Sequence, residues 1–141
     1  MRLDRLAPEL RSLLEEPSAA TLTLYRENGE AITSPVWFRL DGEMFEIVMA
    51  ATDRKLERLR RDPRCVLLVF EAVRPFRGVQ VRASATIAPD EGAQTRLAIA
   101  SRYLGPDEGR AYADPGRRLP GFVVRLPAAA ARAWDLADRL P

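Results

Sequence analysis

Two adjacent cations, Arg54 and Lys55, are the residues of this chain that most clearly suggest chemistry. Lys55 is the only lysine among 22 basic residues. Thr52 or Asp53 is predicted to be the N-cap of a short helix, which places both cations in its first turn. In that turn the helix dipole disfavours each cation by roughly 0.3–1 kcal/mol, and backbone N–H groups lack partners. We therefore predict an anion site, most simply for a phosphate, around Thr52–Lys55.

The alternative is that both side chains are simply solvated. Short helices often carry solvated charges, and arginine is abundant in this chain, at 22 − 1 = 21 residues. Arg58 and Arg61 follow at roughly helical spacing, so the basic cluster is local. A local cluster suits a small anionic ligand better than a nucleic-acid duplex, because the net charge is only +2 and 20 acidic residues are interleaved with the arginines.

Side chains that commonly carry catalysis are scarce. The chain has no histidine, which removes the usual imidazole base and the commonest ligand of zinc or iron, so we expect no metal site. Cys65 cannot form an internal disulfide, and its apolar surroundings indicate a small buried filler. If the chain is an enzyme, a cofactor supplies the hard chemistry, and the catalytic side chain stays unassigned.

The length of 141 residues predicts a single domain over residues 1–141. No apolar stretch approaches the roughly 20 residues that span a bilayer, and the N-terminus lacks the apolar core of a signal peptide. We therefore expect a cytoplasmic protein that binds no membrane and no nucleic acid.

The first half of the chain changes from helical to extended periodicity. Leucines at helical spacing predict a helix over 3–16, ended by Pro17. Three strands then form a meander, with hairpin turns at Asn28-Gly29 and Asp41-Gly42. These strands are expected around Leu22 and Leu24, over 32–40 and over 43–50. The basic helix follows and stops before Pro63.

The elements of the second half are predicted from the alternation of apolar and polar residues and from the residues that end helices and strands. The run 65–71 is apolar on both faces and so indicates a central strand, whereas 79–87 alternates strictly and has one wet face. Segment 128–140 stays open between a helix, which its alanines favour, and a strand carrying Trp134. The other expected elements are helices over 91–104 and 107–113 and a strand over 121–126. About six strands with two or three helices predict a mainly β fold with α, a small closed barrel.

Several motifs occur in an order that resembles a known family. They are Asn28-Gly29, Pro35-Val36-Trp37-Phe38, Asp41-Gly42, Thr52-Asp53-Arg54-Lys55, Leu59–Arg64, Pro75–Val79, Arg102–Gly105 and Trp134-Asp135. Over residues 20–135 this ordered set resembles the split β-barrel flavin-reductase superfamily related to pyridoxamine 5′-phosphate oxidase, in the branch that uses FMN or the deazaflavin coenzyme F-420. The resemblance implies a six-stranded split β-barrel with flanking helices. It also implies a homodimer with a cofactor site at each end of the interface.

The resemblance also implies which residues hold the cofactor. The loop and helix after the third strand would bind its phosphate, through Ala51, Thr52, Arg54 and Lys55. A strand with Pro35, Val36 and Trp37 would lie along the ring. Arg77, Gly78 and Val79 would approach from a neighbouring strand, and Trp134 would close the pocket from either subunit.

Each of these residues also has a purely structural interpretation. Trp37 and Phe38 could be core, Pro35 a strand edge, Arg77 a solvated arginine and Trp134 interface packing. The run 102–105 is best interpreted as a helix end with its cap.

The sequence departs from the family pattern at two places. Relatives often carry a Glu-Gly pair on the long alternating strand, where this chain has Arg82-Ala83-Ser84. The chain ends in Asp135–Pro141 without the arginine-rich motif of the true oxidases, so vitamin B6 oxidation is not expected.

The function that the resemblance implies is a reductase that transfers hydride from FMN or F-420 to an unsaturated small molecule. The basic cluster favours F-420, whose tail carries a phosphodiester and several carboxylates. The alternative is a non-catalytic carrier of a flavin, haem or tetrapyrrole on the same barrel.

Overall fold

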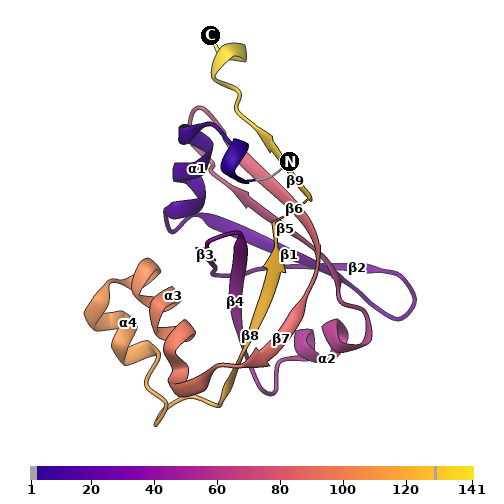
Figure 1. The fold of residues 1–141 in the computed structure, drawn as a ribbon, viewed down its shortest axis with the longest axis vertical. Helices are drawn as coiled ribbons and strands as arrows, with labels where there is room; N and C mark the ends of the chain where they lie inside the picture. Colours follow the sequence, from indigo (N-terminus) through magenta and orange to yellow (C-terminus); the bar gives the residue numbers. More distant parts are fainter. Residues whose placement is uncertain (1–2, 129) are drawn as a thin grey trace.

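The computed structural model describes residues 3–128 and 130–141. Its strands form two antiparallel sheets, one in the order β2-β1-β5-β6-β9 and one in the order β3-β4-β8-β7 (Figure 1). The strands are β1 (Ala19–Tyr25), β2 (Ala31–Pro35), β3 (Arg39–Asp41), β4 (Met44–Ala50), β5 (Arg64–Phe70), β6 (Gly78–Ser84), β7 (Thr86–Pro89), β8 (Gly121–Pro127) and β9 (Ala130–Trp134). The helices are η1 (Leu3–Arg5), α1 (Pro8–Glu15), α2 (Arg54–Arg61), η2 (Glu91–Ala93), α3 (Gln94–Leu104), α4 (Pro106–Tyr112) and η3 (Ala137–Arg139).

The two sheets enclose one hydrophobic core. In the five-stranded sheet, Leu67 of β5 lies between Leu22 of β1 and Val81 of β6, and all three are fully buried. The four-stranded sheet contributes Phe45 and Val124, which are also fully buried. The prediction of a mainly β fold with helices and of a central strand around 65–71 is confirmed.

Two predicted strands are each divided between the sheets. The run 32–40 ends as β2 at Pro35 and resumes as β3 at Arg39 in the other sheet, so the predicted three-stranded meander is wrong. The run 79–87 is likewise split into β6 and β7. At each corner one backbone bond continues the first ladder a single residue past the strand end, from the N–H of Val36 to Ala20 O and from the N–H of Ala85 to Pro63 O. Among the described residues, counting each divided run once gives 9 − 2 = 7 strands from nine elements, so the predicted six is approximate.

Two predicted helices are interrupted. The segment 3–16 contains η1 and then α1, because Pro8 has no N–H and starts a helix rather than continuing one. The segment 91–104 begins as η2 and turns into α3 where Gly92 and Ala93 adopt positive φ values of 64° and 56°.

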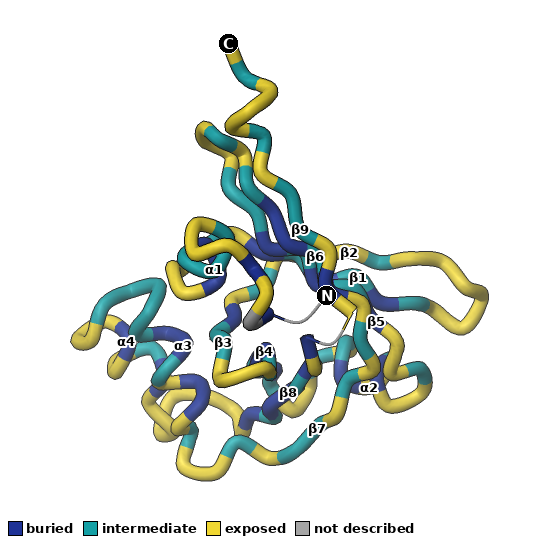
Figure 2. Tube along the Cα trace, turned by 45° about the horizontal axis from the view of Figure 1, so that its top comes forward, coloured by how far each residue is buried: buried dark blue, intermediate teal, exposed yellow. Residues whose placement is uncertain are grey.

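The C-terminal segment, for which the sequence left both a helix and a strand open, forms a strand around Trp134. β9 pairs antiparallel with β6 and places Trp134 opposite Gly78. Figure 2 shows this strand and the C-terminus extending away from the body of the molecule together with the β5–β6 hairpin. Among the described residues, no helix has both the length and the apolar character needed to cross a membrane.

Arg77, paired with Glu71 inside this hairpin, also joins the hairpin to the N-terminal helix. Arg77 donates from Nε to Glu71 Oε1 and from Nη2 to Glu71 Oε2, both at 2.8 Å. Its Nη1 donates to Ser12 Oγ at 3.0 Å and to the backbone oxygen of Glu9 in α1. Arg77 is therefore not a solvated arginine. Its hydrogen bonds lower the pKa of Glu71 below the ordinary value of 4.5.

This lowered pKa predicts how stability depends on pH. Because Glu71 titrates lower in the folded than in the unfolded chain, its pairing stabilises the fold above pH 4.5 and is lost as pH falls through the lowered pKa. We expect Glu71→Gln to be less stable than the wild type near neutrality and to lose less unfolding free energy on acidification. Urea denaturation at a series of pH values measures this. Parallel pH curves for the two proteins would contradict it.

Candidate functional site

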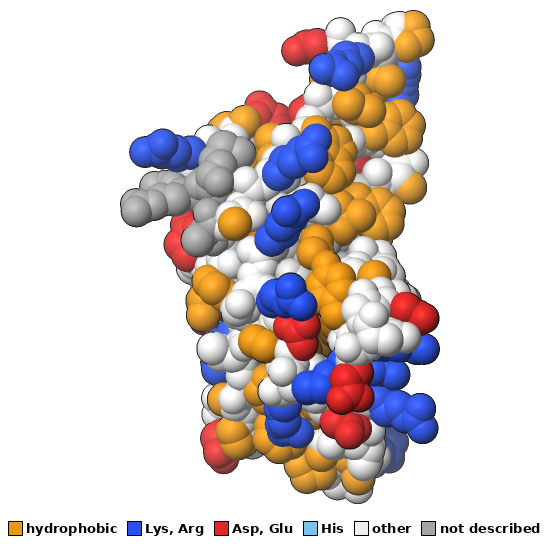
Figure 3. All heavy atoms as spheres, turned by 90° about the vertical axis from the view of Figure 1, so that its right-hand side faces the viewer, with side chains coloured by type: hydrophobic (Ala, Val, Ile, Leu, Met, Phe, Trp, Pro, Cys, Tyr) orange, Lys and Arg blue, Asp and Glu red, His pale blue; other side chains and the backbone are white. Residues whose placement is uncertain are grey.

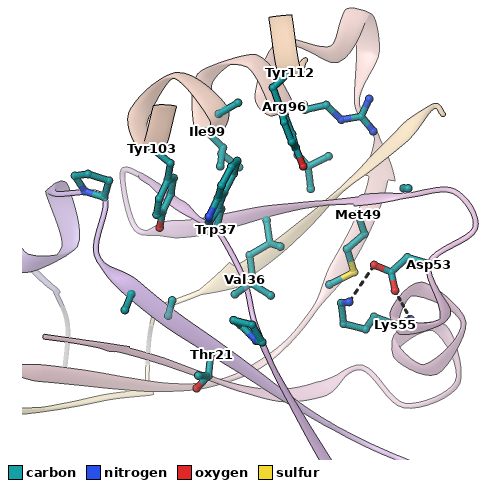
Figure 4. Close-up of a pocket in the computed structure, with 18 of the residues that line it drawn as sticks. Thr21, Val36, Trp37, Met49, Asp53, Lys55, Arg96, Ile99, Tyr103 and Tyr112 are labelled. Carbon is teal, nitrogen blue, oxygen red and sulfur yellow. Dashed lines mark hydrogen bonds and ion pairs between the residues drawn. The ribbon is translucent and has the colours of Figure 1, made fainter. Parts of the chain in front are cut away.

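A cavity of about 730 Å³ lies where the start of α2 faces α3 and α4 (Figure 4). Its floor comes from the ends of β1 and β4, and its rim from the corner between β2 and β3. Cavities of roughly 300–1,000 Å³ with mostly apolar walls and few polar groups are typical of small-molecule sites. Four of the predicted site residues line it: Pro35, Val36, Trp37 and Lys55.

Asp53 controls the basic end of the cavity. Its Oδ1 accepts a hydrogen bond from the backbone N–H of Lys55 at 2.9 Å, which confirms Asp53 as the N-cap of α2. Its Oδ2 lies 3.0 Å from Lys55 Nζ. The expectation that the first-turn N–H of Lys55 lacks a partner is therefore wrong. The carboxylate next to Lys55 offsets the dipole cost of the cation.

An external anion still has groups to bind at this end. Figure 4 shows the Lys55 ammonium between Asp53 and Met49 at the cavity wall. Within residues 3–128 and 130–141 the backbone N–H of Arg54 makes no hydrogen bond. An anion would meet both groups, and it would also face the Asp53 carboxylate. Predicted Ala51, Thr52 and the Arg54 side chain are exposed beside the cavity and do not line it.

Aromatic side chains form the opposite wall. The Trp37 ring stacks on Tyr103 with centroids 4.9 Å apart and 7° between the planes. The Tyr112 ring also lies beside Trp37, with centroids 5.3 Å apart and 46° between the planes. Trp37 is 36% exposed, whereas Phe38 is fully buried against Phe45. The core interpretation is therefore confirmed for Phe38, and ring contact by Trp37 stays a prediction.

The end of α3 fixes this wall to the barrel. Arg102 donates to Phe38 O at 2.8 Å and to Glu16 O at 2.5 Å. The Tyr103 hydroxyl donates to Ser18 O at 2.9 Å and accepts the N–H of Phe38 at 3.4 Å. Burial raises the pKa of Tyr103. The structural interpretation of 102–105 is confirmed, with Gly105 at a φ of 87° capping the helix.

The remaining predicted residues lie on or behind the five-stranded sheet. Gly78 and Trp134 share an outward-facing row with Phe70, which lines the cavity. Val79 is fully buried in the core, and Arg77 is bound to Glu71. Within one chain the structure does not bring these four residues together with Lys55. Their contact with a cofactor stays a prediction.

Comparison with known proteins decides the family. The sequence profile described as pyridoxamine 5′-phosphate oxidase matches residues 6–135. This chain belongs to the pyridoxamine 5′-phosphate oxidase family. Among curated proteins no sequence matches it.

Solved structures of the same fold include proteins with different described roles. A conserved hypothetical protein from Mycobacterium tuberculosis is 25% identical, with a TM-score of 0.79 over 100% of this chain and 93% of that one. An F-420 reductase is 23% identical, with a TM-score of 0.73 over 90% and 98% of the two chains. The haem-storage protein of Vibrio cholerae is 15% identical, with a TM-score of 0.68 over 94% of each chain. The predicted split-barrel fold is confirmed.

In this member of the pyridoxamine 5′-phosphate oxidase family, sequence reasoning missed several cavity residues. Tyr112 and Arg118 come from α4 and the loop after it, and nothing in their sequence context marks them. Arg96 is buried and donates to Leu119 O at 2.9 Å. Asp53 was predicted only as a cap, although its position two residues before the lone lysine was a usable signal.

Other expectations concern groups away from the cavity. Cys65 is buried, and burial raises the pKa of its thiol to about 11, so the filler interpretation is confirmed. Among the described residues, no group of three or more His, Cys, Asp or Glu side chains is arranged to hold a metal ion.

The cap at Asp53 predicts a contrast between two substitutions. Asp53→Ala removes the acceptor for the Lys55 N–H and is expected to lower the free energy of unfolding by roughly 0.5–2 kcal/mol. Asp53→Asn keeps that acceptor and is expected to cost far less, since asparagine caps about as well as aspartate. Chemical denaturation of both variants measures the contrast. Equal losses would show that the cap is not what Asp53 contributes.

Proposed function

We propose that this chain is a reductase that binds FMN or F-420 in the cavity and transfers a hydride to an unsaturated organic small molecule. The observation that carries the proposal is the cavity itself, about 730 Å³, with an ammonium group at one end and an aromatic wall at the other. Family membership supports a flavin-type cofactor in general. We also propose the cytoplasm as its compartment, where an unpaired, buried Cys65 is ordinary.

Each end of the cavity has a separate role in this proposal. Lys55 and the Arg54 N–H hold the cofactor phosphate, and Pro35 and Val36 lie beside the ring. The bound cofactor supplies the hydride, as is general for flavin-type reductases. The chain's own residues orient the reactants and exclude water, since Ile47 and Met49 at the cavity floor are buried and apolar.

The free arginines of α2 favour F-420 over FMN. The side chains of Arg54 and Arg58 make no ion pair or hydrogen bond with the residues that the structure describes. Arg61 is already engaged, since its Nη2 donates to Tyr25 O at 2.9 Å. Figure 3 shows basic side chains gathered on the lower part of the face where α2 lies, with acidic side chains between them. A tail with several negative charges would bind such a surface better than one terminal phosphate.

We further propose a homodimer through the outer face of the five-stranded sheet. Val66, Leu68 and Phe70 point outward along β5, the middle strand, and each is only partly buried within one chain. Apolar side chains contiguous on an open sheet face are typical of an interface. The row that holds Phe70, Gly78 and Trp134 lies on this face, so a partner there would border the cavity.

The competing proposal is a carrier without turnover. A haem-storage protein shares the fold, but at 15% identity this likeness extends to the fold alone. Absorbance of the purified protein separates the cases. A yellow flavin spectrum supports bound FMN, a colourless protein that quenches added F-420 supports a dissociable cosubstrate, and a haem band supports the carrier.

Titration of Lys55→Ala with FMN and with F-420 tests the phosphate site. Losing a charge-assisted contact is expected to weaken cofactor binding by about 1.5–3 kcal/mol, with little loss of fold. Asp53→Asn is the matched control of opposite sign, because it keeps the cap and removes a negative charge beside Lys55. We expect Asp53→Asn to bind either cofactor more tightly than the wild type. Equal affinities for wild type and Lys55→Ala would refute the site.

A substitution on β5 tests the dimer. Leu68→Glu places a carboxylate at the centre of the proposed interface and is expected to convert a dimer to a monomer without unfolding it. Sedimentation velocity measures the mass, and circular dichroism monitors the fold. Glu30→Gln, in the exposed turn between β1 and β2, is the control and should leave the mass unchanged. A wild type that sediments as a monomer would contradict the proposal.

A further inference from the structure

One buried positive charge at the cavity has no negative charge paired with it. Arg96, on α3, is 8% exposed and lines the cavity. Its guanidinium forms no ion pair with the residues that the structure describes. The Asp90 carboxylate is engaged elsewhere, because it accepts the backbone N–H groups of Thr95 and Arg96. Buried charges in proteins are normally paired, since an unpaired ion loses its hydration without compensation. A bound anion would supply the missing negative charge.

Part of the Arg96 guanidinium is open to a ligand. Its Nη2 donates to Leu119 O at 2.9 Å, whereas Nε and Nη1 have no acceptor within residues 3–128 and 130–141. Every side-chain nitrogen or oxygen that is sealed from solvent in this part of the chain has a hydrogen-bond partner. Nε and Nη1 are therefore reachable by solvent, and the cavity is the space that Arg96 lines. A planar guanidinium with open N–H groups suits a carboxylate, whose oxygens accept hydrogen bonds in one plane.

Gly121 leaves the space that this guanidinium occupies. A Cβ atom at position 121 would lie 2.7 Å from Arg96 Nη2 and 2.9 Å from a methyl carbon of Val48. Any side chain there would displace the guanidinium. Gly121 pairs with Ala50 at the end of β4, and Ala50 also lines the cavity. Two small residues on neighbouring strands thus keep the charge of Arg96 at the cavity wall.

The charges at the cavity are unbalanced on its helical side. Among the described residues, the charged side chains that line it are Asp53, Lys55, Arg96 and Arg118, a net charge of 3 − 1 = +2. Lys55 and Asp53 pair with each other, so the excess belongs to the two arginines. Arg118 is exposed and forms no ion pair with the described residues, and its Nε donates to Tyr112 O at 3.0 Å. A cleft with an excess of one sign raises the local concentration of opposite charges.

Arg96 and Lys55 reach the cavity from different elements. Figure 4 shows Arg96 and Tyr112 extending from the helices α3 and α4, and Lys55 and Asp53 lying at α2 on the opposite side. A cofactor phosphate held by Lys55 would leave the charge of Arg96 unmatched. A second anionic group, on the second ligand, would match it. The aromatic wall that includes Trp37 suits a flat carbon skeleton on that ligand.

We propose that Arg96, assisted by Arg118, binds a carboxylate of the substrate, so that the substrates are flat, unsaturated molecules that carry a carboxylic acid. The inference rests on the proposed function, because it assigns Lys55 to the cofactor. Nε and Nη1 of Arg96 donate to the carboxylate, and Arg118 attracts the anion at the cavity mouth. Arg96 is therefore a substrate-binding residue, and no bond is made or broken at it.

Calorimetric titration with trans-cinnamate and with its neutral amide, trans-cinnamamide, tests the assignment. The wild type, with and without FMN or F-420, is expected to bind the acid more tightly than the amide. Arg96→Gln removes the charge and is expected to weaken cinnamate binding by roughly 10- to 150-fold, the effect of a hydrogen bond to a charged group. Its affinities for cinnamamide and for either cofactor should not change.

Arg110→Gln is the matched control. Arg110 is an exposed arginine of α4 that does not line the cavity, and its loss changes the net charge equally. All affinities of this variant should equal those of the wild type. If Arg96→Gln fails to fold, the wild-type preference for acid over amide still decides, and Arg96→Lys, which keeps the charge, should retain part of that preference.

Specific outcomes would overturn the inference. A wild type that binds cinnamate no more tightly than cinnamamide would remove the carboxylate site. Equal weakening of both ligands in Arg96→Gln would show that Arg96 only shapes the cavity. Displacement of cinnamate by a cofactor, together with weaker cofactor binding in Arg96→Gln, would assign the anion to the cofactor. A wild type that binds cinnamate through Arg96 but binds neither cofactor would support the carboxylate site and refute the proposed function.

Discussion

The corner at Val36–Phe38, where the chain leaves one sheet and enters the other, is the constraint on which the site depends. The chain turns there with Phe38 in the core, and α3 binds both backbone groups of that residue, its N–H through Tyr103 and its carbonyl through Arg102. Because Trp37 precedes Phe38, the same contacts that close the barrel orient the aromatic wall. The packing that closes the barrel therefore also determines the shape of the cavity. A change that loosens Arg102 would disturb both.

At the start of α2, the positive charge of Lys55 and the negative charge of Asp53 lie together at one end of the cavity. A lysine in a first turn is unfavourable alone, and Asp53 makes it acceptable by capping the backbone and pairing with the ammonium. The phosphate proposed to bind here would have to share Lys55 with the Asp53 carboxylate. Such an arrangement suits a ligand that binds and leaves, because a like charge beside the site limits affinity.

Local chemistry made parts of the fold predictable from sequence. Turns at Asn28-Gly29 and Asp41-Gly42, the Asp53 cap and the central β5 follow from residue types and short-range periodicity. The splits at 36–38 and at Ala85 could not be predicted. An alternating pattern indicates which side chains face the core, but it does not indicate which of two sheets the strand joins. Only some of the residues that line the cavity could be predicted. Lys55 and Trp37 lie in strong local motifs, whereas Tyr112 reaches the cavity through the tertiary packing of α4 beside α3.

The contact between β6 and β9 ties two distant positions together. A methyl group at Gly78 would lie 2.1 Å from the Trp134 ring, so the indole occupies the space that any larger residue would need. The two positions therefore share a single volume, although they are 134 − 78 = 56 residues apart in the sequence. In descendants of this chain, a side chain gained at one position requires bulk lost at the other. A larger residue at position 78 can therefore follow only after position 134 has changed, whereas Trp134 itself can shrink first.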